Sequence, residues 1–196
     1  MKTDRQEYAG EAFKALFLRE GRFTSKEFRD CAFDGCDFTR AEFSLCRFEN
    51  CSFRGCNLSL ARLGSSVFTG TAFKDSKLVG VNWTEAHWPR IRLAAPVSFD
   101  NCLMNDSVFL GLALPKTRFS GCQARGADFR DADLAGADLR RADLSGALFG
   151  GTNLEGADFA GARGYSLNPG DNRLKGARFS LPEAVALLRG LGIKLE

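Results

Sequence analysis

The chain carries a large apolar residue at every fifth position. From Tyr8 to Leu93, eighteen consecutive fifth positions are Phe, Leu, Trp or Tyr. After one inserted residue the ladder resumes at Phe99 and continues to Phe159, with Ala124 as its one small member. A period of five fits neither the 3.6 residues of a helical turn nor the 2.0 of an ordinary strand. Each five-residue unit is therefore expected to turn one corner of a repeat solenoid.

A small residue nearly always stands two positions before the large one, and this slot explains the cysteines. All seven occupy it: Cys31, Cys36, Cys46, Cys51, Cys56, Cys102 and Cys122. A thiol is compact and apolar enough for an interior slot. The odd count and the spacings in multiples of five match no zinc or disulfide framework. We expect structural, buried cysteines, no metal site and no cofactor.

The second half of the chain carries a recognisable motif. Residues 127–131, 132–136 and 137–141 read Ala-Asp-Phe-Arg-Asp, Ala-Asp-Leu-Ala-Gly and Ala-Asp-Leu-Arg-Arg, which is the A(D/N)LXX pattern. The chain therefore resembles pentapeptide-repeat proteins from Phe13 to Phe179. The resemblance implies an all-β solenoid, a right-handed quadrilateral β-helix with four pentads per coil. Residues twenty apart should then stack, as in the column Phe28, Phe48, Phe68 and Trp88.

Two segments break the repeat. Residues 94–98 contain the extra position and a proline, which cannot donate to a strand ladder, so a phase break is expected there. Residues 161–173 place Gly164 and Pro169 in the ladder, where neither can fill a core, so this segment is predicted to be a loop. The repeat domain is assigned to residues 1–179, and a C-terminal helix and tail to residues 180–196.

Ser180 and Glu183 form a capping-box pattern that predicts the start of a short C-terminal helix. This helix and its tail are unusually apolar for a surface element, through Val185, Leu187, Leu188, Leu191 and Ile193. It could fold back to cap the open end of the solenoid, or it could form a two-fold dimer. Resemblance to the resistance proteins of the family favours a homodimer through these residues.

Composition argues against several functions. The chain has a single histidine, His87, and an interior filled by Phe and Leu, so no catalytic group of residues is expected and the protein is predicted not to be an enzyme. A net charge of +3, from 27 basic and 24 acidic residues, does not predict direct nucleic-acid binding. The N-terminus lacks an apolar signal core and no stretch is long enough for a membrane span, so a cytoplasmic location is expected.

The partner is implied only by resemblance. Residues 80–89, 98–107 and 177–184 are similar to segments of the albicidin-immunity group of the family, and residues 187–193, more distantly, to its quinolone-resistance group. Those proteins bind DNA gyrase, a type II topoisomerase, and protect it from inhibitors. A rod that imitates DNA should be acidic, and this chain is slightly basic.

Contact through loops is therefore favoured, because binding residues usually lie on loops held by a rigid scaffold. The candidate partner-facing residues are Pro96, Tyr165, Asn168, Pro169 and Asp171. The alternative is a structural or scaffolding repeat protein with another protein partner, which would explain the same fold.

Overall fold

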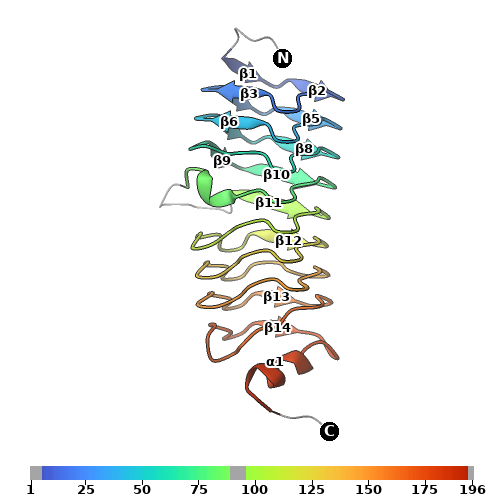
Figure 1. Cartoon of the computed structure of the whole chain (residues 1–196), viewed down its shortest axis with the longest axis vertical. Helices are drawn as coiled ribbons and strands as arrows, with labels where there is room; N and C mark the ends of the chain where they lie inside the picture. Colours follow the sequence, from blue (N-terminus) through green and yellow to red (C-terminus); the bar gives the residue numbers. More distant parts are fainter. Residues whose placement is uncertain (1–5, 89–95, 194–196) are drawn as a thin grey trace.

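The computed structural model describes residues 6–88 and 96–193. It is a β-solenoid of about eight turns, which form an upright rod with the two ends of the chain at opposite ends (Figure 1). Its strands are β1 (Glu7–Ala9), β2 (Ala12–Lys14), β3 (Arg22–Thr24), β4 (Glu27–Arg29), β5 (Ala32–Asp34), β6 (Glu42–Ser44), β7 (Arg47–Glu49), β8 (Ser52–Arg54), β9 (Val67–Thr69), β10 (Thr71–Lys74), β11 (Val97–Asp100), β12 (Arg118–Ser120), β13 (Asp158–Phe159) and β14 (Arg178–Phe179). A 3₁₀ turn, η1 (Trp83–Glu85), and one helix, α1 (Val185–Gly190), complete the list.

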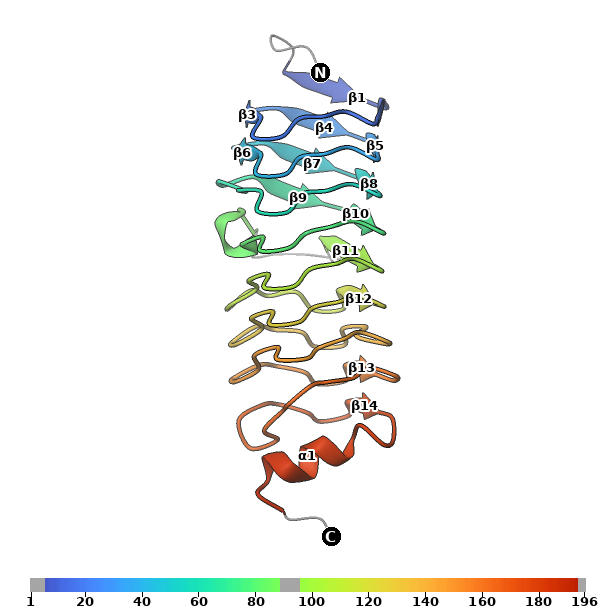
Figure 2. The same ribbon diagram turned by 45° about the vertical axis from the view of Figure 1, so that its right-hand side comes forward.

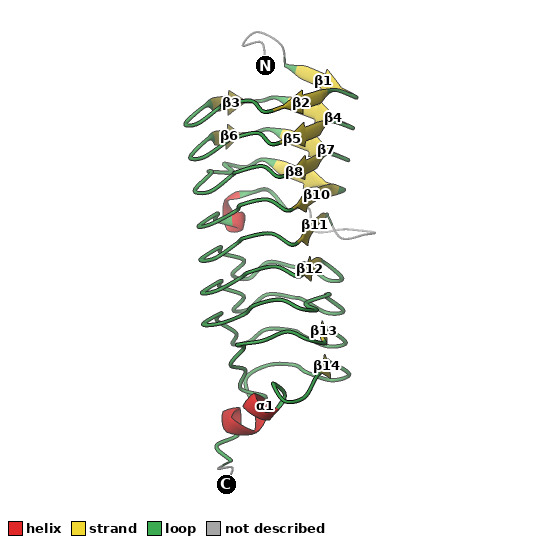
Figure 3. Cartoon of the chain, turned by 90° about the vertical axis from the view of Figure 1, so that its right-hand side faces the viewer, coloured by secondary structure: helices red, strands yellow, loops and turns green. Residues whose placement is uncertain are grey.

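Every strand pair is parallel, and the register fixes four faces. Phe33 pairs with Phe53, and Phe48 with Phe68, so one coil takes twenty residues. Four pentads thus make one coil, which confirms the predicted solenoid. We number the faces by their ladder residues in the order of the chain: face 1 begins at Tyr8 (β1, β4, β7 and β9), face 2 at Phe13 (β2, β5, β8, β10, β11 and β12), face 3 at Leu18 and face 4 at Phe23 (β3 and β6). The longer strands gather in the N-terminal half (Figure 3).

The core is a set of stacked side-chain columns, one for each face, and the columns of faces 1, 2 and 4 contain stacked aromatic rings. On face 1, Phe28 lies 5.0 Å from Phe48 with the rings 7° from parallel, and Phe48 lies 5.1 Å from Phe68. Phe33 and Phe53 on face 2 are 4.5 Å apart. Rings of neighbouring faces meet edge to face, as Phe28 and Phe33 do. Both arrangements are favourable for aromatic pairs, so the Phe-rich half is held by ring contacts both along and across the rod.

One coil is longer than the others. The backbone of His87 donates to the Ser66 carbonyl at 2.8 Å, which keeps face 1 in the twenty-residue register. On face 2, however, Phe73 pairs with Phe99, twenty-six residues on. The extra residues therefore enter the chain between His87 and Val97. Leu93 and residues 94 and 95 of the predicted phase break lie outside the described residues. Trp88 is half-buried; its ring tilts 48° against Trp83 and its indole N–H donates to the Trp83 carbonyl.

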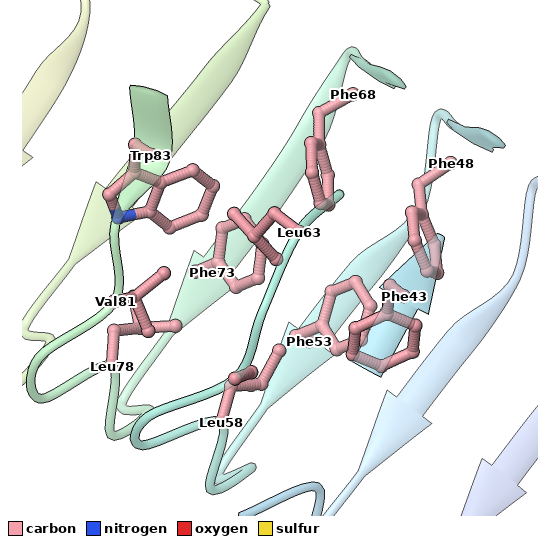
Figure 4. A pocket seen from close by; sticks show the side chains of 11 residues that line it. Phe43, Phe48, Phe53, Leu58, Leu63, Phe68, Phe73, Leu78, Val81 and Trp83 are labelled. Carbon is pink, nitrogen blue, oxygen red and sulfur yellow. The ribbon is translucent and has the colours of Figure 1, made fainter. Parts of the chain in front are cut away.

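A small apolar void interrupts the core where leucines replace phenylalanines. Its volume is about 10 Å³, and the side chains that point into it include Leu58, Leu63, Leu78, Val81 and Trp83 (Figure 4). Leu63 is the one aliphatic residue in a face 4 column otherwise built of rings from Phe23 to Phe149. An apolar space of this size has room for at most one water molecule and no polar partner for it. The void is a packing defect rather than a ligand site.

The C-terminal end is covered by α1, which lies across the last coil (Figure 2). Ala186 and Leu187 pack against the core, and a Cβ on Gly190 would collide with the Leu167 carbonyl. The helix therefore caps the solenoid. The predicted capping box is wrong, because no side chain caps α1 and the Ser180 hydroxyl accepts instead from the Gly161 N–H of the preceding coil at 3.0 Å.

The seven cysteines are free and buried, in the small inward slot that their register predicts. Burial raises the pKa of Cys51 and Cys56 to about 12, because the low-dielectric interior disfavours the thiolate. Within residues 6–88 and 96–193, no helix has the length and apolarity that crossing a membrane requires.

Candidate partner-binding surface

Faces 1 and 2 carry mixed charge that is largely neutralised from coil to coil. On face 1, Glu27 is in register with Arg47, and Arg29 lies 2.7 Å from Glu27 and 3.7 Å from Glu49. On face 2, Arg118 pairs with Asp100 at 3.2 Å. Up to residue 179, no large apolar side chain among the described residues is exposed on either face. These two faces are therefore polar sheets without an evident docking patch.

Exposed apolar residues gather on the other two faces. Before the C-terminal cap, the large apolar side chains that the described chain exposes are Phe17, Leu45, Leu60, Leu110 and Leu148. Phe17 lies on face 3, Leu110 and Leu148 on face 4, and Leu60 and Leu45 at the corners that end faces 3 and 4. Scattered exposed leucines need no explanation. Their confinement to one side of the rod makes faces 3 and 4 the candidate partner-binding surface.

Face 4 also carries two irregular segments. The turn η1 replaces a regular corner after Trp83, and residues 165–171 replace the corresponding pentad of the last coil. Both project on the same side of the rod in two views (Figures 1 and 2). Between them lie Leu110 and Leu148, separated by the Arg130 guanidinium, which is held on Asp128 by bonds of 2.9 and 2.7 Å. Protein interfaces have an apolar core and are enriched in Arg, and both features occur here.

Face 3 contains a buried carboxylate, that of Asp143, which is only 3% exposed. It accepts from the Ser145 hydroxyl at 2.7 Å, from Arg125 at 2.8 and 3.0 Å and from Arg163 at 3.1 Å. Burial alone would raise its pKa, but these hydrogen bonds outweigh burial and hold the pKa of Asp143 well below its usual range. The cluster ties three successive coils together directly beside the loop that starts at Gly164.

Two of the predicted partner-facing residues are buried. Pro96 is buried, and its carbonyl accepts from the Thr71 N–H at 3.1 Å. Tyr165 is 4% exposed, with its ring 5.6 Å from Phe159 and 5.7 Å from Phe179. Because Gly164 cannot fill the ladder position, Tyr165 turns inward and fills the core instead. This corrects the prediction that Pro96 and Tyr165 face a partner.

The remaining loop candidates form a closed turn at the surface. Asn168 and Pro169 are half-buried, and Asp171 is exposed. The Asn168 side chain donates to Asp171 at 2.6 Å and accepts from the Gly170 N–H at 2.9 Å. The Asp171 carbonyl accepts from Gly151 at 2.8 Å, which ties the turn to the previous coil. The turn is thus held in one shape, and contact of these three residues with a partner stays a prediction.

The predicted dimer residues divide into two sets. Val185 and Leu187 are half-buried, and Leu187 packs against the core of this chain. Leu188, Leu191 and Ile193 are exposed at the end of the rod. The helix thus caps the solenoid and still presents three apolar side chains outward. Whether they pair with a second copy stays a prediction.

The described residues show no arrangement of side chains that would support a specific reaction. His87 is exposed beside the 3₁₀ turn, and within residues 6–88 and 96–193 its side chain forms no hydrogen bond or ion pair. Over the same residues, no group of three His, Cys, Asp or Glu side chains is placed to hold a metal ion.

Sequence reasoning overlooked the exposed leucines. Leu110 follows a ladder residue directly and Leu148 precedes one, and both positions point outward in the repeat. An apolar residue in an outward position was therefore a readable signal. The signal is hard to recognise in the sequence because leucine also occupies many of the inward ladder positions.

Comparisons with known proteins agree with this architecture. A family model described as "Pentapeptide repeat region" matches residues 26–96, and one described as "Pentapeptide repeats (8 copies)" matches residues 137–163. Together the two matches cover half of the chain. A search of curated proteins found no match.

Solved structures of QnrB1, a plasmid-mediated fluoroquinolone resistance protein, share the fold. A trypsin-treated variant is 21% identical, with a TM-score of 0.66 over 100% of this chain and 95% of that chain. The full-length protein, also 21% identical, gives a TM-score of 0.60 over 95% of this chain and 100% of that one. The similarity thus extends over nearly the whole of both chains.

Proposed function

Because the chain belongs to the pentapeptide-repeat family, we propose that it is a non-enzymatic immunity protein that binds DNA gyrase, or a related type II topoisomerase, and protects it from a topoisomerase poison. The observation that carries the proposal is the agreement in fold, from end to end, with a fluoroquinolone resistance protein. The local resemblance of residues 80–89, 98–107 and 177–184 to immunity proteins supports the same partner. A cytoplasmic location is part of the proposal.

Faces 3 and 4 are proposed as the side that contacts the topoisomerase. An imitation of DNA would need a continuous acidic surface to match the charge of the phosphate backbone. Here acidic and basic side chains alternate along the rod, as Arg22, Glu42 and Arg62 do on face 4. The mixed charge favours contact through apolar residues and the turn at residues 168–171. The rod would then act as a rigid support that fixes where these elements lie.

A homodimer through the C-terminal cap is part of the same proposal. Leu188, Leu191 and Ile193 form an apolar end surface that a second copy related by a two-fold axis would cover. Both copies would then present faces 3 and 4 at fixed distances along a longer rod.

The proposal is tested by a gyrase supercoiling assay in the presence of albicidin or a fluoroquinolone, with the purified protein titrated in. We expect supercoiling to recover at protein concentrations that do not inhibit gyrase alone. The variant Leu110→Glu/Leu148→Glu should lose the recovery, because it places charge in the apolar stripe of face 4. The matched control is Ala12→Glu/Ser52→Glu, which changes two exposed positions of face 2.

Two results would contradict the proposal in different ways. Inhibition of gyrase without recovery would mean that the protein binds gyrase but does not protect it from that poison. No effect of either kind would favour the alternative, a scaffolding protein with another partner, which would use the same exposed leucines.

A further inference from the structure

A surface groove lies in the N-terminal half of the rod, at the corner where face 3 ends and face 4 begins. Leu60 is 48% exposed there, and its end methyl group lies over Gly80 of the next coil, 2.7 Å from where a Cβ would stand. Around Leu60, the groove is lined by Glu20, Arg22, Arg40, Glu42 and Arg62. The groove therefore combines one fixed aliphatic side chain with three guanidinium groups.

The arginines of this groove form longer ion pairs than Arg130 and Arg140 do. Arg22 and Arg62 share the Glu42 carboxylate at 3.3 and 3.6 Å, and Arg40 lies 3.9 Å from Glu20. Within residues 6–88 and 96–193, none of these three side chains forms a hydrogen bond of good geometry. By contrast, Arg130 and Arg140 each donate two short bonds to one carboxylate. The groove thus presents exposed, charged guanidinium groups whose ion pairs are long, so that N–H donors are left for a partner.

We propose that the groove around Leu60 is a docking site for a protein segment that carries a carboxylate beside an aliphatic or aromatic side chain. Guanidinium groups bind carboxylates with paired hydrogen bonds, and Arg is enriched where interfaces bury it beside apolar residues. Three arginines against two glutamates leave an excess of positive charge for an acidic partner. A nucleic acid fits less well, because Glu20 and Glu42 repel phosphate and Leu60 offers no contact to a backbone.

The proposed docking site does not depend on whether the protein binds a topoisomerase, so the test contains no topoisomerase. Random twelve-residue peptides displayed on phage are selected on the immobilised protein, and the enriched peptides are synthesised. We expect Asp or Glu next to Leu, Ile or Phe in the enriched set. Binding of the synthetic peptides should weaken at least tenfold for Arg40→Ala/Arg62→Ala.

The chain supplies matched controls for both parts of the groove. Arg141 occupies the same left-handed corner position as Arg40, and Arg118 the same position before a ladder residue as Arg62, but both lie on face 2. Binding to Arg118→Ala/Arg141→Ala should change less than twofold. Leu45 matches Leu60 in residue type, corner position and positive φ, but lies outside the groove. Leu60→Ala should weaken binding and Leu45→Ala should not.

Three results would overturn the proposal: enrichment of basic peptides or of none, equal loss in the groove and control variants, or tighter binding of a duplex oligonucleotide than of the peptides at the same salt concentration. Circular dichroism of each variant separates a loss of binding from a loss of fold. These side chains are exposed, so we expect all four variants to keep the spectrum of the unaltered protein.

Discussion

Replacing Asp143 by Asn should destabilise the protein by about 2 kcal/mol at pH 7. The buried carboxylate accepts from Arg125 and Arg163, whose side chains are 55% and 66% exposed. Each of these pairs is therefore assigned the upper end of the range for exposed ion pairs, about 1 kcal/mol. Asn keeps an oxygen for the Ser145 N–H and hydroxyl, so the substitution removes only the charge and the acceptor oxygen that face the two arginines.

The same substitution predicts a dependence on pH. The pKa of Asp143 is lower in the folded protein than in the unfolded chain, because the hydrogen bonds from Ser145, Arg125 and Arg163 outweigh the effect of burial. A lowered folded pKa stabilises the protein above the unfolded value of about 4, and this stabilisation is lost as the pH falls below it. The cost of Asp143→Asn should therefore be larger at pH 7 than at pH 3.

Guanidinium unfolding followed by circular dichroism measures this cost, and amide hydrogen exchange locates it. Since each coil contacts only its neighbours, faster exchange should appear first around Leu144 and Arg163. The control is Asp138→Asn, whose carboxylate is 20% exposed and binds only Arg140 closely; it should cost about 0.5–1 kcal/mol. A cost that is the same at pH 7 and pH 3, or no larger than that of the control, would refute the reasoning.

Four further predictions follow from the same geometry. Gly164→Ala should destabilise by more than about 2 kcal/mol, because φ is +71° and the new Cβ would collide with Ser145; Gly111→Ala, with the same sign of φ and open space, should cost about 1–2 kcal/mol by denaturant unfolding. Leu188→Glu/Leu191→Glu should reduce the mass in light scattering to that of a monomer without changing the circular dichroism spectrum; an unchanged dimer mass would exclude this interface. Tyr165→Phe should be neutral or should stabilise by about 1 kcal/mol, because the buried hydroxyl has no hydrogen-bond partner among the described residues; a clear loss of stability would show that it has one. Cys51 and Cys56, whose pKa burial raises to about 12, should not react with a disulfide reagent at pH 8 until the protein is unfolded, and prompt reaction in the native state would contradict their burial.

The ladder could be predicted from the sequence because one physical requirement sets it. A solenoid that turns once every five residues needs one large inward residue in each pentad. Phe28, Phe48 and Phe68 stack as their spacing indicates. The cysteine positions followed from the same register. The twenty-six-residue length of one coil could not be predicted in this way. Leu93 continues the five-residue spacing in the sequence, although the strand of face 2 resumes only at Val97.

The candidate site was less accessible because it depends on how each interruption is repaired. Where Gly164 leaves a gap in the core, a neighbouring large residue has to fill it, and Tyr165 does. The position of Tyr165 within a predicted loop therefore led to the wrong prediction that it faces a partner. The grooves and ion clusters join side chains eighteen or twenty positions apart, as Arg125 and Asp143 are. Such pairs can be read from a sequence only when the register of the coils is already known.

The long coil between His87 and Val97 shows how a repeat of this kind can evolve. The register of face 1 holds up to His87, and that of face 2 resumes at Val97 with Phe73 still stacked on Phe99 at 5.4 Å. The extra residues therefore leave the ring columns of faces 2 and 4 unbroken. Selection can lengthen or replace corners one at a time without repacking the interior. A protein built this way can acquire a new partner by local insertion, while its rod is inherited unchanged.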